Sequence, residues 1–509
     1  MTDHALRLLR SDRRLAGLAA FPFNFDLDRA ACGHVEPVRL ASGGPLEVVA
    51  GDDTGGTYFV CPDGSVLYAD SEGSAGIIGS SVDEALEVLI GLPGWLDCAD
   101  LSPADGEEEI LARVAEVEED LREHYGIDDE RAELRAALGF PERSPVELVG
   151  MLHAALLRTE PDFLLLNAEE GCAYRPLTGS GGPPLWEPVL ARGRADLALL
   201  RAGDTEAWDA VAADPVRRRP VLRAAQFDRA AQDLELLRHL LRHEARSSST
   251  DELRLAAVLV GLHGDAADLP LLHEVREADH DTHCGLGGVP GPGADGAALR
   301  RWAEELDASL FGTDPSDEPL LTWVELARAQ GMRELARAAL IRRLDEIVMN
   351  QGLLRRPGAP AVLDTFPLHA LALAFEALGD PFQALRAQRL YAALQDGSRE
   401  RASARLAQAR LERETGRLTD AARTLASLRA VLTAPGGGAP APWREADLGR
   451  LTAEEHHALA LALTDAGLDG EAREVFTAGE AIRGELARGS AAAVREPAET
   501  AAERAGRTG

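Results

Sequence analysis

The segment from Gly51 to Trp95 constrains the fold of this chain more closely than any other segment. Its three short runs of β-forming residues are separated by Asp-Gly and Glu-Gly pairs, which favour the tight turns of antiparallel hairpins. An apolar pattern of helical period follows at once and predicts a helix over residues 81–91. This order predicts a small, mostly antiparallel sheet with flanking helices. The three predicted strands are Thr57–Val60, Ser65–Ala69 and Ala75–Ile78.

The residues on either side extend this pattern into an α+β domain over residues 1–105. The spacing of leucine and alanine predicts a helix over residues 1–20. A Gly-Gly turn joins two further short strands, and Pro37 makes the first of them an edge strand at best. These two strands are Val38–Leu40 and Leu46–Val49.

Residues 106–245 are predicted to form a helical middle region. It begins with a long acidic helix over Glu107–Tyr125, which has an apolar residue at every turn. An arginine run, Arg217–Arg219, stands before Pro220 in an otherwise acidic chain, and we expect these arginines to form internal ion pairs. Further helices are predicted near 129–138, 145–158, 187–201, 203–213 and 227–245.

The second half of the chain has the pattern of helical repeats. Residues 251–316 are predicted to form a HEAT-like helical unit with a Gly-rich loop, and residues 317–488 tetratricopeptide-like helical hairpins. In four places a glycine is followed five residues later by an alanine, a spacing that suits a tight turn between closely packed helices. Residues 489–509 lack a core pattern and are expected to be disordered. The four pairs are Gly331/Ala336, Gly379/Ala384, Gly416/Ala421 and Gly467/Ala472.

Charge excludes several classes of partner. The 509 residues carry 53 basic and 85 acidic side chains, a net charge of −32, which disfavours nucleic acid and anionic membranes. Residues 51–140 hold 23 Asp and Glu against four Arg, a net of −19 that would attract a basic partner. A solvated helix surface is the alternative explanation of this acidity. With no signal peptide, no apolar run of membrane length and five scattered cysteines, a cytoplasmic location is expected.

One sequence motif could bind a metal ion. His280, His283 and Cys284 lie close together before a Gly-rich loop, but their spacing matches no standard zinc motif and no second ligand pair follows. A helix end that leads into a polar loop is the other interpretation. The glycine loop is not a phosphate-binding P-loop, because the chain contains no lysine. We therefore predict no metal, cofactor or catalytic residue.

The opening segment resembles the SUKH superfamily, which joins fungal cell-wall-synthesis regulators to bacterial immunity proteins. Its acidic glycine turn leads into an aromatic strand, and further short turns follow. The resemblance covers about the first 100 residues, and it implies a non-enzymatic domain that binds and neutralises a toxin, often a nuclease. The matching residues are Gly51-Asp52-Asp53-Thr54-Gly55-Gly56, Tyr58-Phe59, Val66-Leu67-Tyr68, Glu72-Gly73 and Ser80-Ser81.

Three hypotheses follow. In the first, an immunity-type protein neutralises a basic toxin, such as a nuclease, through an acidic surface. In the second, a scaffold or regulatory hub binds peptides through its helical repeats. In the third, a metal-dependent hydrolase is centred on His280, His283 and Cys284. We favour the first, and the residues predicted to shape its fold signature or acidic surface are Asp52, Asp53, Tyr58, Asp70, Glu72, Trp95, Glu107, Glu108 and Glu109.

Overall fold

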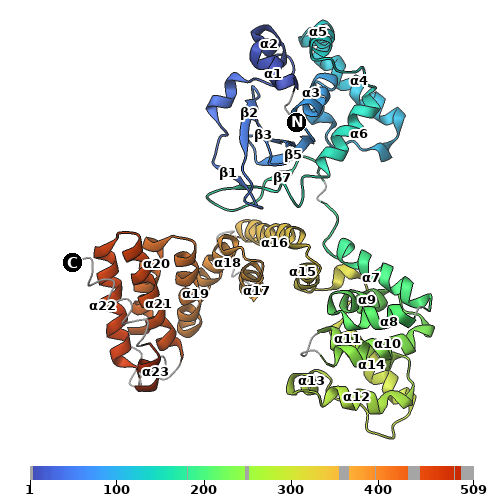
Figure 1. Ribbon diagram of the computed structural model, residues 1–509, viewed down its shortest axis with the longest axis vertical. Coiled ribbons are helices and arrows are strands. Elements are labelled where there is room, and N and C mark those ends of the chain that lie inside the picture. Colours follow the sequence, from blue (N-terminus) through green and yellow to red (C-terminus); the bar gives the residue numbers. More distant parts are fainter. Residues whose placement is uncertain are drawn as a thin grey trace. The chain divides into compact units, whose positions relative to one another are not determined.

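The computed structural model is mostly helical, with a small sheet region near the N-terminus and a helical C-terminal part (Figure 1). No helix in the described part of the chain is both long enough and apolar enough to cross a membrane. The contacts divide the chain into two compact units. The first comprises Met1–Val35, Leu40–Leu164 and Arg175–Ala339, and the second Glu36–Arg39, Leu165–Tyr174 and Leu340–Gly509. The structure describes residues 4–179, 182–203, 205–246, 251–354, 366–395, 397–433, 447–486 and 488–494.

The sheet of the first unit has five strands in the order β2-β3-β4-β5-β7. The first four form an antiparallel meander, and β7 lies parallel to β5 at one edge. Tyr58 stands opposite Tyr68 in the register of β3 and β4. The predicted small, mostly antiparallel sheet is confirmed. The strands are β2 (Glu47–Gly51), β3 (Thr57–Val60), β4 (Val66–Ala69), β5 (Ser74–Gly79) and β7 (Arg175–Pro176).

Six helices contribute to one buried core with this sheet. Leu86 of α3 and Leu148 of α6 belong to the same buried cluster as Tyr58 and Ile78 of the sheet. The core therefore continues well past residue 105, where we predicted the first domain to end. The helices are α1 (His4–Ser11), α2 (Arg13–Ala20), α3 (Val82–Gly91), α4 (Glu107–His124), α5 (Asp128–Leu138) and α6 (Pro145–Leu156). Short 3₁₀ turns are η1 (Asp28–Cys32), η2 (Trp95–Cys98) and η3 (Pro103–Asp105).

The single helix predicted over residues 1–20 is two helices, and Asp12 is the reason. Its side chain accepts hydrogen bonds from the backbone N–H groups of Arg14 and Leu15, which caps the start of α2 and ends α1.

The helical part of the first unit has its own buried core, which runs from α7 to α14. The helix α9 contradicts our sequence prediction, which left residues 215–226 without a helix. Pro220 lies inside α9, and Gly193 of α7 lets the Pro220 backbone approach closely, since an added Cβ at Gly193 would collide with the Pro220 carbonyl. The helices are α7 (Trp186–Arg201), α8 (Thr205–Ala213), α9 (Pro215–Phe227), α10 (Leu234–Glu244), α11 (Asp251–Leu262), α12 (Leu269–Arg276), α13 (His280–Gly285), α14 (Gly296–Leu310) and α15 (Leu320–Ala329), with turns η4 (Ala231–Asp233), η5 (Ala266–Asp268) and η6 (Pro315–Asp317).

Arginines of α9 form ion pairs with other helices of this helical part. Arg218 contacts the fully buried Glu244 at 2.5 Å, and Arg219 contacts the same carboxylate at 2.9 Å. Arg217 pairs with Asp196 of α7. The predicted internal ion pairs of Arg217–Arg219 are therefore confirmed.

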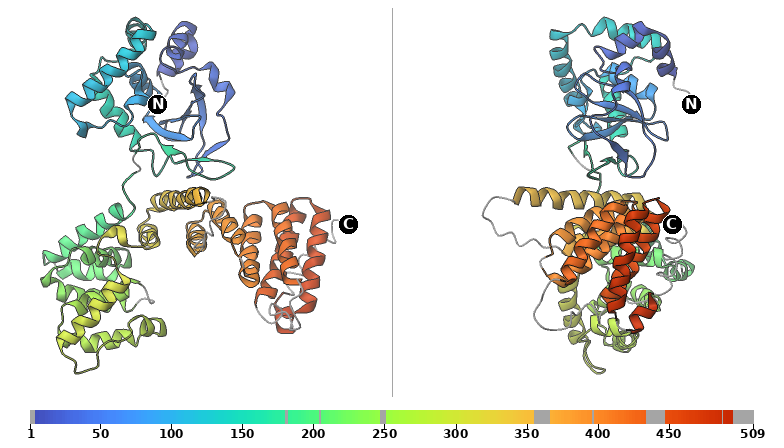
Figure 2. Two further views of the ribbon diagram at one scale, coloured as in Figure 1. Left: turned by 180° about the vertical axis from the view of Figure 1, so that it is seen from behind. Right: turned by 90° about the vertical axis from the view of Figure 1, so that its left-hand side faces the viewer.

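The second unit is built mainly from helical hairpins, in which successive helices pack side by side (Figure 2). Helix α16 (Arg333–Leu354) begins in the first unit and continues into the second. In all four predicted Gly/Ala pairs the glycine has a φ between 70° and 79°, and the alanine is at most 1% exposed. This confirms the prediction of tight turns and closely packed helices. The other helices are α17 (Phe366–Ala377), α18 (Pro381–Ala393), α19 (Ser398–Glu414), α20 (Leu418–Thr433), α21 (Asp447–Asp465), α22 (Asp469–Glu485) and α23 (Arg488–Ala493).

Two features of the second unit differ from the sequence prediction. The segment Leu165–Tyr174, for which we predicted neither helix nor strand within the helical middle region, contributes strand β6 (Leu165–Asn167), which pairs with β1 (Val38–Leu40). Helix α23 extends into the stretch 489–509 that we expected to be disordered, and Val494, which follows this helix, belongs to a buried cluster against which Leu432 and Leu448 pack. The remainder of that stretch lies outside the described residues.

Candidate functional site

Asp52 is a buried carboxylate that holds the turn between β2 and β3. Its Oδ1 accepts hydrogen bonds from the N–H groups of Thr54 and Gly56, at 2.9 and 2.7 Å, and from the Thr54 hydroxyl. Its Oδ2 accepts one from the Tyr68 hydroxyl at 2.6 Å. A side chain at Gly56 would collide with both Asp52 and Tyr68, so the turn requires glycine there. At 4% exposure, Asp52 shapes the fold and cannot contact a partner directly.

Aromatic residues form a chain of ring contacts beneath this turn. Tyr58 lies 5.0 Å from Tyr68, and Tyr68 lies 5.0 Å edge-on to Trp95, measured between ring centroids. Burial, together with the negative charge of Asp52, raises the pKa of both tyrosines well above its usual value, so both hydroxyls stay protonated. Tyr58 and Trp95 are therefore core residues, and their contribution is to the fold signature.

The other acidic residues predicted for the sheet region lie in the turn between β2 and β3 and in the turn between β4 and β5, and only some of them are exposed. Asp70 is half-buried, and its Oδ1 accepts hydrogen bonds from the N–H groups of Glu72 and Ser74, which fixes the turn before β5. The side chains of Asp53 and Glu72 are exposed. The two turns that carry them are joined by the Ser71 hydroxyl, which donates to the Thr54 carbonyl at 3.2 Å.

Glu107, Glu108 and Glu109 are the first three residues of α4, and all three are exposed. We call them the α4 glutamates. They lie on the positive end of the helix macrodipole, which favours carboxylates there. In the described part of the chain, no ion pair or side-chain hydrogen bond engages these carboxylates. They are therefore available to a partner.

Further along α4, the acidic residues are used internally. Glu118 pairs with Arg122 at 2.5 Å and with Arg131 at 2.8 Å, and Arg122 also pairs with Asp128. Glu87 of α3 pairs with Arg143. Part of the net charge of −19 is thus used in ion pairs within the fold, and the α4 glutamates belong to the part that forms no ion pair among the described residues.

The candidate metal-binding motif of His280, His283 and Cys284 does not bring its three side chains together. His283 lies between Glu277, 3.2 Å from its Nδ1, and Arg276, 3.1 Å from its Nε2. Only His280 and Cys284 approach each other, with 3.8 Å between Nε2 and Sγ. The motif forms the short helix α13, capped by Asp279, as the helix-end interpretation predicted.

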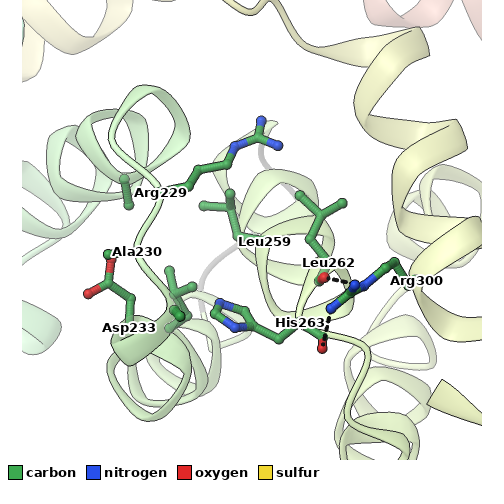
Figure 3. A pocket seen from close by; sticks show the side chains of 10 residues that line it. Arg229, Ala230, Asp233, Leu259, Leu262, His263 and Arg300 are labelled. Carbon is green, nitrogen blue, oxygen red and sulfur yellow. Dashed lines mark hydrogen bonds between the residues drawn. The ribbon is translucent and has the colours of Figure 1, made fainter. Parts of the chain in front are cut away.

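A pocket of about 240 Å³ lies in the helical part of the first unit (Figure 3). The His263 ring faces its middle, and burial lowers the pKa of this histidine. Arg300 donates to the backbone carbonyls of Leu262 and His263, both at 3.0 Å. Two further charged lining residues are also paired, Arg229 with Asp307 and Asp233 with Arg201. These charged groups stabilise the helix packing around the pocket.

The second unit contains a larger groove, of about 850 Å³, between α19 and α21. Leu406, Leu448 and Leu451 give it an apolar lining, and Leu451 is 41% exposed. At its rim, Arg410 pairs with Glu376, and Glu455 pairs with Arg413. The groove therefore offers an apolar surface between fixed charged groups.

A group that the sequence analysis missed comes together on two helices of the first unit. Asp209, His239 and His243 place one possible metal-ligating atom each within 4.8 Å of the others. The four-residue spacing of the two histidines was visible in the sequence, but the contribution of Asp209 from another helix was not.

No family model, no curated protein and no solved structure matches this chain. The SUKH-like and repeat-family resemblances therefore rest on the residues of the chain itself.

Proposed function

We propose that this protein is a non-enzymatic binding protein of the immunity type, which neutralises a basic protein toxin such as a nuclease. The observation that carries the proposal is the exposed position of the α4 glutamates, which have no ion-pair partner among the described residues, in a segment of net charge −19. Exposed charges of one sign steer an oppositely charged partner and give a complex that weakens as salt increases.

The test is inhibition of a basic nuclease domain encoded beside the gene of this protein. We expect the full chain to inhibit the nuclease at low salt and to bind about tenfold or more weakly at ~0.5 M salt. Changing the α4 glutamates together to glutamine (E107Q/E108Q/E109Q) should weaken binding about tenfold at low salt, mainly through slower association. Inhibition curves and association rates measure both effects.

A matched control removes three exposed charges elsewhere. The variant E304Q/E305Q/E474Q neutralises exposed carboxylates of α14 and α22 and should bind as the unchanged protein does. Thermal melts check that both triple variants fold. If neither the protein nor its variants inhibit any neighbouring basic nuclease at equimolar ratio, the immunity proposal is wrong.

The groove between α19 and α21 supports a second candidate function, a hub that binds apolar peptides through its helical repeats. Helical-repeat proteins bind extended segments on the surfaces that their stacked helices create. A random peptide library displayed on phage and selected on the full chain tests this function. Peptides with apolar anchors should be enriched on the unchanged protein and at least tenfold less on L406D/L451D. Equal enrichment on both proteins would rule out the groove.

A further inference from the structure

Two histidines of α10 and one aspartate of α8 converge outside every site predicted from the sequence. His239 and His243 are four residues apart on one helix, so their rings project from the same face, with 4.9 Å between ring centroids. Asp209 Oδ1 lies 3.3 Å from His239 Nε2. Both helices belong to the first unit and pack against each other.

The distances suit one small metal ion. Two ligand atoms bound at about 2.0–2.1 Å to a tetrahedral zinc ion lie roughly 3.3–3.4 Å apart. The observed 3.3 Å between Asp209 and His239 is that separation. Because all three ligand atoms lie within 4.8 Å of one another, no ligand atom needs to move by more than about 1.5 Å. The side chain of Asp209 is 80% exposed, so its carboxylate can rotate to follow the ion.

The local environment prepares the histidines to act as ligands. His239 Nε2 is buried and makes no well-aligned hydrogen bond with any described residue, so a metal ion would satisfy it. Trp208, beside Asp209, is fixed by its indole N–H, which donates to the Leu200 carbonyl at 2.9 Å.

We propose that Asp209, His239 and His243 bind a divalent transition-metal ion of the zinc type. Two imidazole nitrogens and one carboxylate favour such an ion over calcium or magnesium, which prefer oxygen ligands. The three ligands leave a fourth position open to water, and the ion ties α8 to α10. This site is independent of the α4 glutamates and of the proposed toxin binding.

Zinc titration of the metal-stripped full chain, without an affinity tag and at pH 7.5, tests the proposal. Calorimetry should show one zinc ion per chain, with binding about tenfold or more weaker in H243Q and lost in H239Q/H243Q. At a free zinc concentration ten times the dissociation constant, amide hydrogen exchange in α8 and α10 should slow by about tenfold. D209N, changed at an exposed side chain, should weaken binding without affecting the fold.

The variant H280Q/C284S is the matched control, because it removes the ligand pair of the earlier metal motif. It should bind zinc as the unchanged protein does. Absence of binding at ~100 μM zinc would overturn the proposal. So would binding that survives in H239Q/H243Q, or that is lost only in H280Q/C284S. Circular dichroism of each variant separates loss of metal binding from loss of fold.

Discussion

Changing Arg223 to methionine is expected to lower the free energy of unfolding of the helical part of the first unit by about 3–5 kcal/mol. Arg223 is 1% exposed, and its guanidinium contacts Glu252 at 2.8 Å and Glu318 at 3.2 Å. Without it, two carboxylates remain in the protein interior with no compensating charge from that position. Gln226 also loses a hydrogen bond from Arg223. Amide hydrogen exchange of α9 and α11 measures the change locally.

Two comparisons make this prediction specific. Changing Arg229 to alanine removes an ion pair with Asp307 that is partly exposed, and it should cost no more than about 1 kcal/mol. The triple variant R223M/E252L/E318L removes the whole charged group and should recover most of the stability lost in R223M. If the free energy of unfolding of R223M lies within about 1 kcal/mol of that of the unchanged protein, the buried ion pairs of Arg223 do not stabilise this part of the fold as we expect.

Changing Asp52 to alanine is expected to destabilise the sheet region by about 3 kcal/mol. The buried N–H of Gly56 and the hydroxyl of Tyr68 both lose their hydrogen-bond acceptor. Asparagine at this position keeps one acceptor oxygen and should have a smaller effect. Denaturant unfolding measures the loss of stability in each variant. Near-ultraviolet circular dichroism can follow this unfolding, because Tyr68 contacts Trp95 and the signal of these rings depends on their packing.

Asp70 provides the control for Asp52. Its carboxylate also fixes a turn through two backbone N–H groups, but it is half-buried, so water can replace the lost bonds. D70A should therefore cost about 1 kcal/mol. Equal losses in D52A and D70A would contradict the view that burial makes Asp52 important.

Local chemistry allowed much of the fold to be predicted from the sequence. Strand β3 begins and ends where the run of aromatic and β-branched residues does, and α3 follows with Val82, Leu86 and Leu89 fully buried. The helical hairpins were visible because a glycine with positive φ and a small buried alanine leave a local pattern. The exposed position of Glu107–Glu109 likewise followed from helical periodicity.

The features that the sequence did not reveal depend on contacts between distant residues. Strand β6 has three residues, and its partner β1 lies more than 120 positions earlier, so no local pattern marks the pair. Helix α9 was missed because Pro220 normally interrupts a helix, and its close packing against Gly193 of α7 is a contact between distant residues. Burial of Asp52 and convergence of Asp209 on α10 are also tertiary effects.

The segment Leu165–Tyr174 has a consequence for how this protein can be divided. It belongs to the second unit, where the Gly171 carbonyl accepts a hydrogen bond from Gln383 at 2.7 Å and the Ala173 N–H donates to Asp345 at 2.9 Å. The stretches of gene on both sides of it encode the first unit. A single recombination point anywhere between codons 40 and 340 therefore divides the coding sequence of at least one unit. Neither unit is encoded by one continuous stretch of the gene. Recombination at one point therefore cannot exchange one intact unit without the other.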